Sequence, residues 1–135
     1  MEISYLKLKG FRNFKDAHIN FNSNTLIIGA NDVGKSNMLH SLRMLLDKSV
    51  SDSGIEPNEL DFHLENGNSC EEFEIILHFK DINEDAVLSI LKGNVSDSGE
   101  SFIKYVAQKS DLSYKLFIGD SLESLQEINS RYYLK

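Results

Sequence analysis

The feature that most constrains the fold is a three-part segment at residues 25–47. Residues 25–28 are almost wholly apolar, as expected for a strand buried on both faces. Residues 29–36 read Gly-Ala-Asn-Asp-Val-Gly-Lys-Ser, a loop with a glycine near each end. Over residues 36–47, apolar side chains recur at three- and four-residue spacing, which predicts a helix with one apolar face. The chain therefore contains a predicted strand–loop–helix unit.

The loop fits the Walker A pattern, G-x-x-x-x-G-K-[ST], and its residue types suit a phosphate ligand. Its glycines let the main chain approach a phosphate, while the loop amides and the positive end of the helix hold negative charge. Lys35 supplies a point charge for the β- and γ-phosphates, and the Ser36 hydroxyl is the predicted Mg²⁺ ligand. The sequence thus predicts ATP and Mg²⁺ as cofactors. The predicted nucleotide-binding residues of this segment are Gly29, Ala30, Asn31, Asp32, Val33, Gly34, Lys35, Ser36 and Asn37.

Length and charge limit the other possibilities. The chain has 135 residues, one cysteine and a net charge of -7, which argues against nucleic-acid binding by the whole chain. Residues 1–48 carry +3 and the remainder -10, so the basic part coincides with the predicted phosphate site. No apolar run reaches the length of a membrane helix and no signal peptide is evident. We expect a cytoplasmic protein without a membrane partner.

The fold class predicted is α/β with α+β character, in which the strand–loop–helix unit adjoins an antiparallel β layer. We divide residues 1–135 into a P-loop core (1–48), a loop (49–71) with a helical turn at 57–60, and antiparallel strands with short helices (72–135). Alternating patterns predict strands at 3–9 (ended by Gly10), 18–21, 72–80 (half-exposed), 102–108 and 114–118. Short helices are expected at 85–91 and 122–128.

Other candidate sites are weaker. The four histidines, His18, His40, His63 and His78, lack partners at zinc-ligand spacing, and Cys70 has no base near it in sequence. Asp120 follows an apolar strand, but Ser121 stands where a catalytic acid would be needed. The carboxylates are scattered, which indicates solvated side chains and no two-metal centre. We therefore predict no catalytic residue in this chain.

The first 47 residues resemble the start of an ABC-type ATPase head, as found in the RecF, SMC and OLD families. The resemblance is carried by Lys-Gly-Phe-Arg-Asn-Phe at 9–14 and by the run from Asn24 to Asn37. The Asn-Asp-Val-Gly-Lys-Ser-Asn form of the loop is most similar to the OLD family (overcoming lysogenization defect), ATP-dependent nucleases that include the GajA subunit of Gabija anti-phage systems. Asp61-Phe62-His63 and the strand after it also resemble that family.

The resemblance implies a function larger than this chain. Arg12 and Asn13 would lie beside the nucleotide, and two ATPase heads would sandwich ATP. The parent protein would be an ATPase and DNA endonuclease of antiviral defence or DNA metabolism, with DNA bound through other parts of it. The family's Walker B acids, signature motif and Toprim nuclease domain lie downstream of its P-loop, so we expect a nucleotide-binding fragment with little hydrolysis. Its partners would be the rest of the parent chain or a second head.

Two alternatives remain open at this point. One is an ATPase head of the RecF or SMC type that acts on DNA without a nuclease. The other is a non-catalytic assembly module whose P-loop has become structural.

Overall fold

The computed structural model describes residues 1–21, 32–91 and 93–134, with only the backbone described for Asp32 and Val33. The predicted strand at 25–28 and the loop residues Gly29, Ala30 and Asn31 lie outside the described residues.

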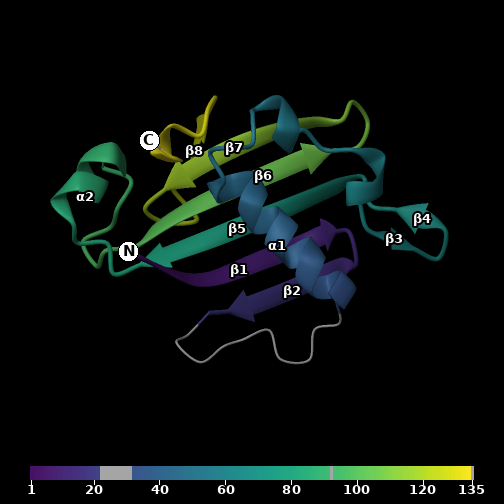
Figure 1. Cartoon of the computed structure of the whole chain (residues 1–135), viewed down its shortest axis with the longest axis horizontal. Helices are drawn as coiled ribbons and strands as arrows, with labels where there is room; N and C mark the ends of the chain where they lie inside the picture. Colours follow the sequence, from purple (N-terminus) through teal and green to yellow (C-terminus); the bar gives the residue numbers. More distant parts are fainter. Residues whose placement is uncertain (22–31, 92, 135) are drawn as a thin grey trace.

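A mixed α/β fold places one long helix across an antiparallel sheet (Figure 1). Within the described residues the sheet has six strands in the order β2-β1-β5-β6-β7-β8. The strands are β1 (Glu2–Phe11), β2 (Phe14–Asn20), β5 (Glu72–Lys80), β6 (Ser101–Gln108), β7 (Ser113–Gly119) and β8 (Gln126–Ile128). The helices are α1 (Asp32–Leu46) and α2 (Asp85–Leu91). These elements confirm the predicted α/β class with an antiparallel layer.

The core lies between α1 and the sheet face that it covers. Alternate residues of the central strands point to this face, because successive side chains of a strand lie on opposite sides. Leu6 of β1, Leu77 of β5 and Ile103 of β6 are cross-strand neighbours and are almost fully buried. Met38, Met44 and Leu45 of α1 are part of the same buried cluster. Part of the apolar helix pattern seen in the sequence, Met38 and Leu45, therefore faces the core, whereas Leu39 of the same pattern is 44% exposed.

The strand β5 has the predicted bounds, but the prediction of a half-exposed strand is wrong. Ile76 and His78 point away from α1, yet they are only 7% and 6% exposed. The His78 ring lies between the rings of Tyr5, 4.7 Å away, and Phe102, 4.5 Å away. Side chains of neighbouring strands thus cover the second face of the sheet at its centre.

The strand β1 continues through Gly10, which the sequence pattern had predicted to end it. Gly10 has φ +72°, and a Cβ atom there would lie 2.8 Å from the Glu72 carbonyl oxygen of β5. Glycine is needed because it adopts this backbone conformation and allows the close approach. After Gly10, Phe11 ends β1 and pairs with Phe14 of β2. Arg12 therefore lies in the turn between the two strands.

Residues 49–71 contain more structure than the predicted loop. Two 3-10 turns, η1 (Ser53–Ile55) and η2 (Glu59–Asp61), precede a small hairpin of β3 (Leu64–Glu65) and β4 (Asn68–Ser69). The predicted helical turn at 57–60 corresponds closely to η2. Asn58 starts it with a reciprocal capping box, since its side chain accepts from the Leu60 amide and its own amide donates to Asp61 Oδ2.

The helix expected at 122–128 is absent from the described structure, and this prediction is wrong. Residues Gln126–Ile128 instead form β8, which pairs with β7 through Leu116 and Ile128. A turn stabilised by the Ser124 hydroxyl, which donates to Asp120 Oδ1 at 2.5 Å, precedes it. The weak helical pattern is outweighed by the main-chain hydrogen bonds that the free edge of β7 offers. Helix α2, by contrast, has the predicted bounds.

The C-terminal end of α1 is held by Arg131, whose side chain is 6% exposed. Its Nη1 donates to the carbonyls of Met44 (3.1 Å) and Asp47 (3.0 Å), and its Nη2 donates to that of Val50. Tyr133 of η3 (Tyr132–Leu134) adds a hydroxyl bond of 2.9 Å to the Leu45 carbonyl. A positive charge at this end also matches the helix dipole. This clamp fixes the helix whose other end carries the predicted site.

Candidate nucleotide-binding site

The last residues of the Walker A motif form the first turn of α1. The helix begins at Asp32, four residues before the start predicted from periodicity, so Lys35 and Ser36 lie in its N-terminal part. Gly34 is buried, while Lys35 and Ser36 are exposed and Asn37 is half-buried. The N-terminal end of a 15-residue helix carries partial positive charge. Two polar side chains that the sequence assigned to phosphate and Mg²⁺ therefore lie at an electropositive helix end.

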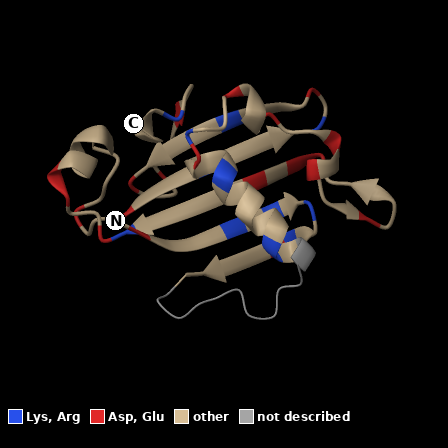
Figure 2. Cartoon of the chain, in the orientation of Figure 1, with Lys and Arg blue, Asp and Glu red and all other residues tan. Residues whose placement is uncertain are grey.

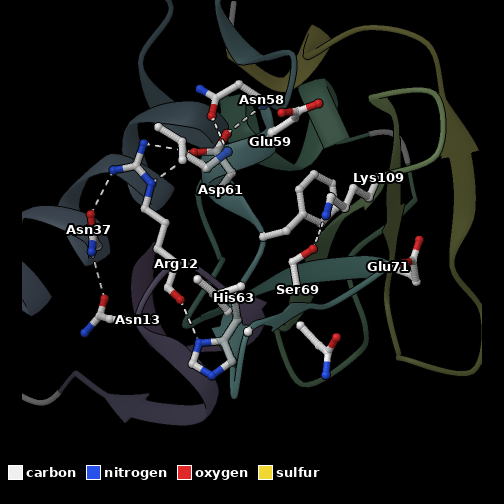
Figure 3. Close-up of a pocket in the computed structure, with 15 residues that line it drawn as sticks. Arg12, Asn13, Asn37, Asn58, Glu59, Asp61, His63, Ser69, Glu71 and Lys109 are labelled. Carbon is white, nitrogen blue, oxygen red and sulfur yellow. Dashed lines mark hydrogen bonds and ion pairs between the residues drawn. The ribbon is translucent and has the colours of Figure 1, made fainter.

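Arg12 and Asn13 reach the same end of α1 from the β1–β2 turn. Arg12 Nη1 donates to Asn37 Oδ1 at 2.8 Å, and Asn37 Nδ2 donates to Asn13 Oδ1 at 2.8 Å (Figure 3). The structure thus brings together three of the predicted site residues that are up to 25 positions apart in sequence. Figure 2 shows basic positions on β1, the β1–β2 turn and α1, consistent with a site for an anion.

An acid that the sequence analysis had treated as solvated completes this cluster. Asp61 is 2% exposed, so the expectation of solvated carboxylates is wrong at this position. Its Oδ1 accepts from Arg12 Nε at 3.0 Å and forms an ion pair with Arg12 Nη2 at 3.0 Å. Burial of a carboxylate is compatible with folding because it is paired and hydrogen-bonded. The capping-box spacing of Asn58 and Asp61 was the sequence signal that could have identified a structured acid here.

His63 fixes the main chain of the same turn. Its Nδ1 lies 2.7 Å from the Arg12 carbonyl oxygen and must carry the proton, since a carbonyl only accepts. The Arg12 amide donates to the Asp61 carbonyl at 2.8 Å, and the His63 amide donates to that of Gly10 at 2.8 Å. These bonds support Arg12 in the left-handed region, with φ 51°. Both the main chain and side chain of Arg12 are therefore held by residues 61–63.

The Arg12–Asp61 pair changes the pKa of one nearby group, His40. The pKa of His40, on α1, is lowered first by burial and then by the positive charge of Arg12, while Asp61 acts in the opposite direction. The Arg12 guanidinium is thus an electrostatic influence on the first turns of α1.

An open cavity of about 1200 Å³ lies beside Arg12, between the helix end and the β3–β4 hairpin. Figure 3 shows Arg12 and Asn37 on one side of it and Lys109 and Ser69 on the other, with the Lys109 ammonium directed at the Ser69 hydroxyl. The cavity is mainly polar at these two ends and has Phe62 and Leu64 among its apolar residues. Its lining residues are Arg12, Asn13, Asn37, Asn58, Glu59, Leu60, Asp61, Phe62, His63, Leu64, Gly67, Asn68, Ser69, Glu71 and Lys109.

The donors present fit a nucleotide with its metal. Lys35 and the helix end suit phosphates, the Ser36 hydroxyl suits Mg²⁺, and the adjacent cavity is large enough for the rest of the nucleotide. Among the residues that the structure describes, no group of three or more His, Cys, Asp or Glu side chains is placed to hold a metal ion. Asp120 lies in the turn before β8, where its carboxylate accepts from Ser124.

No helix in the described part of the chain combines the length and apolar character needed to cross a membrane.

Comparison with known proteins gives consistent matches. The chain is 33% identical over 126 residues to Endonuclease GajA of Bacillus cereus (strain VD045), covering 89% of this chain and 21% of GajA. Among solved structures, it matches a chain from work on ATP-driven dimerization and DNA-stimulated activation of SMC ATPases. That match has a TM-score of 0.66 and 25% identity, and covers 99% of this chain and 76% of the other. The predicted resemblance to a GajA-like ATPase segment within the SMC-type superfamily is confirmed.

The family described as AAA ATPase domain matches residues 1–133, nearly the whole chain. This match agrees with the helix-end site and with the fold shared with SMC ATPases. The chain therefore belongs to the AAA ATPase domain family.

Proposed function

We propose that this chain binds ATP–Mg²⁺ at the N-terminal end of α1, as the nucleotide-binding segment of a larger ATPase and nuclease. The observation that carries the proposal is the convergence of five predicted site residues on one helix end. Lys35 and Ser36 lie exposed in its first turns, and Arg12 and Asn13 are joined to it through Asn37. Such an arrangement of a helix N-terminal end, cations and a hydroxyl suits a polyphosphate.

Each part of the nucleotide has a proposed contact. Lys35 and the loop residues Gly29, Ala30, Asn31, Asp32, Val33 and Gly34 would hold the phosphates. Ser36 would supply one Mg²⁺ ligand. The ribose and base would extend toward Arg12, Asn13 and the neighbouring cavity, because this is the large hollow next to the helix end.

Hydrolysis would need groups beyond those described. Phosphoryl transfer to water requires a residue that positions the attacking water, and the described residues near the helix end offer no such acid apart from Asp61, which is occupied by Arg12. We therefore propose that the chain alone binds nucleotide with little turnover.

The exposed side of α1 supports a role within a larger assembly. Leu39 is 44% exposed, and a shallow groove of about 720 Å³ runs past Leu42 and Leu46 to Leu134. Apolar side chains gathered on one helix face are typical of a surface that another element covers. We propose that the rest of the parent chain, or a second ATPase head, covers this groove.

The likeness to GajA supports a cytoplasmic nuclease of the OLD type, active in antiviral defence or DNA metabolism, with DNA contacts in other parts of the parent protein. The chain spans 21% of that relative, so this activity is a proposal for the parent protein. The likeness to SMC ATPases favours the second candidate, a head that acts on DNA without a nuclease. An acidic Toprim pattern in the parent gene would support the first candidate, and long heptad repeats the second.

Calorimetric titration of ATP–Mg²⁺ into the chain and its Lys35→Ala variant tests nucleotide binding. We expect a saturable heat for the wild type and its loss in Lys35→Ala. Lys48→Ala is the matched control, because it removes an exposed lysine just beyond the other end of α1 and should bind like the wild type. Equal heats for the wild type and Lys35→Ala would overturn the proposal. If neither binds and light scattering shows concentration-dependent association, the P-loop is structural and the chain is an assembly module.

A further inference from the structure

Asp61 is an acid in a site proposed for an anion, and its position is therefore unexpected. A carboxylate close to a polyphosphate repels it, and a buried carboxylate also loses hydration. Asp61 is 2% exposed and lines the same cavity as Arg12 and Asn37. We therefore expect Asp61 to make a contact that favours ligand binding and offsets this repulsion.

The contacts of Asp61 indicate that role. Its Oδ1 accepts a hydrogen bond from Arg12 Nε at 3.0 Å and forms an ion pair with Arg12 Nη2 at 3.0 Å. Its Oδ2 accepts from the Asn58 amide at 3.0 Å. The guanidinium is planar, so holding two of its nitrogens fixes the direction of the third. That third nitrogen, Nη1, donates to Asn37 Oδ1 at 2.8 Å. Asp61 thus determines how Arg12 faces the helix end.

The remaining donors of Arg12 can meet a ligand. A guanidinium has five N–H groups, and the contacts to Asp61 and Asn37 account for three of them. Both residues line the cavity, but the arginine side chain is 27% exposed and that of Asp61 only 3%. Arg12 is therefore the more accessible of the two to an anion.

We propose that Asp61 is a positioning residue for nucleotide binding, which acts by holding Arg12 toward the helix end. This deepens the proposed function and rests on it. Removal of the Asp61 charge has opposite expected effects on ATP affinity under the two roles. If Asp61 only lines the cavity, removal of its negative charge strengthens binding of an anion. If it positions Arg12, the same change weakens binding.

The test is a titration of ATP–Mg²⁺ into the wild type, Asp61→Asn and Glu59→Gln. Glu59 is the matched control, because it is an exposed acid that lines the same cavity two residues away and, in the described structure, forms no hydrogen bond or ion pair with Arg12. We expect Asp61→Asn to weaken ATP binding about tenfold, as for a lost charge-assisted hydrogen bond. Glu59→Gln should leave the affinity unchanged or slightly higher.

A double-mutant cycle separates positioning from misfolding. In an Arg12→Met background, Asp61→Asn should cause no further loss of affinity, because the residue that it positions is absent. An NMR titration of His40 gives a readout without nucleotide. Loss of the Asp61 charge by itself lowers the imidazole pKa, whereas displacement of Arg12 raises it, so a raised His40 pKa in Asp61→Asn reports displacement of Arg12.

The outcomes distinguish this inference from the function on which it rests. If the wild type binds ATP and Asp61→Asn binds as tightly as Glu59→Gln, the positioning role is overturned and nucleotide binding stands. An equal loss from Asp61→Asn in the wild-type and Arg12→Met backgrounds also overturns it. No binding by the wild type overturns the proposed function and this inference together.

Discussion

An arginine from a distant part of the chain holds each end of α1, and the two arginines are bound in different ways. At the N-terminal end, Arg12 pairs with a carboxylate and a side-chain amide, and its side chain is 27% exposed. At the C-terminal end, the Arg131 side chain is 6% exposed and donates to three main-chain carbonyls. Asp52, its nearest carboxylate, is 3.9 Å from Nε.

The difference separates stabilisation from ligand binding. Arg131 donates to three main-chain carbonyls at the helix end, as expected for a side chain that caps a helix C-terminus. Arg12 retains N–H groups beside a cavity. Its partner is the carboxylate of Asp61, and an apolar pair could replace both side chains in the fold. We infer that Arg131 mainly stabilises the fold, while Arg12 mainly serves the nucleotide site.

Removal of Arg131 should have the largest effect on stability. Arg131→Met leaves the carbonyls of Met44, Asp47 and Val50 without their buried donor, which should cost about 2–4 kcal/mol in the free energy of unfolding. Urea denaturation measures this loss. Arg43→Met is the control, because it breaks the ion pair between an exposed residue of α1 and Asp47, directly after the helix, and should cost at most about 0.5 kcal/mol. Similar losses of unfolding free energy in Arg131→Met and Arg43→Met would contradict the stabilising role given to Arg131.

The Arg12–Asp61 pair should be replaceable for folding but not for binding. Arg12→Met alone leaves the buried Asp61 without its partner and should destabilise the chain by about 3 kcal/mol. Arg12→Met combined with Asp61→Leu should recover most of that loss, because an apolar pair can fill the same space. ATP binding should stay weak in both variants. Recovery of binding along with stability in the double variant would contradict the role given to Arg12.

Tyr133→Phe should have a smaller effect at the Arg131 end. It removes the hydroxyl bond to the Leu45 carbonyl and should cost about 1 kcal/mol of unfolding free energy. The affinity for ATP–Mg²⁺ should be unchanged. Calorimetry and denaturation on the same sample check both statements, and a change in affinity without a change in stability would show that this end also belongs to the site.

The smallest expected effect is on the titration of His40. Burial and Arg12 hold its folded-state pKa below the ordinary value near 6.5, so the unfolded chain takes up the proton first. This contribution to stability is present above pH 6.5 and is lost as the pH falls below it. NMR titration should show a higher His40 pKa in Arg12→Met and no change in Arg131→Met. The same shift in both variants would mean a general loosening of α1.

The sequence predicted the elements that have a long, clear period. The helix α1, the strand β5 and the helix α2 follow from apolar spacing, and the resemblance predicted that Arg12 and Asn13 lie beside the nucleotide. The short β8 was mistaken for helix, because three residues carry too little pattern to outweigh the edge of a sheet.

The contacts of Arg12 and Arg131 at the two ends of α1 could not be predicted from the sequence. Asp61 lies 49 residues from Arg12 in sequence, and Arg131 lies 87 residues from Met44. Neither spacing has a local signature, so only the folded arrangement identifies the pairs. Burial also reversed the interpretation of Asp61, since an acid in a polar loop is ordinarily solvated.

The central claim is that nucleotide binds at the Arg12 end of α1 and not at the Arg131 end. Hydrogen exchange of the backbone amides, with and without saturating ATP–Mg²⁺, tests it most directly. We expect slower exchange at residues 34–38 and 58–63 and no change at 131–134. Protection at 131–134 alone, or exchange at 34–38 that saturating nucleotide leaves unchanged, would contradict the account.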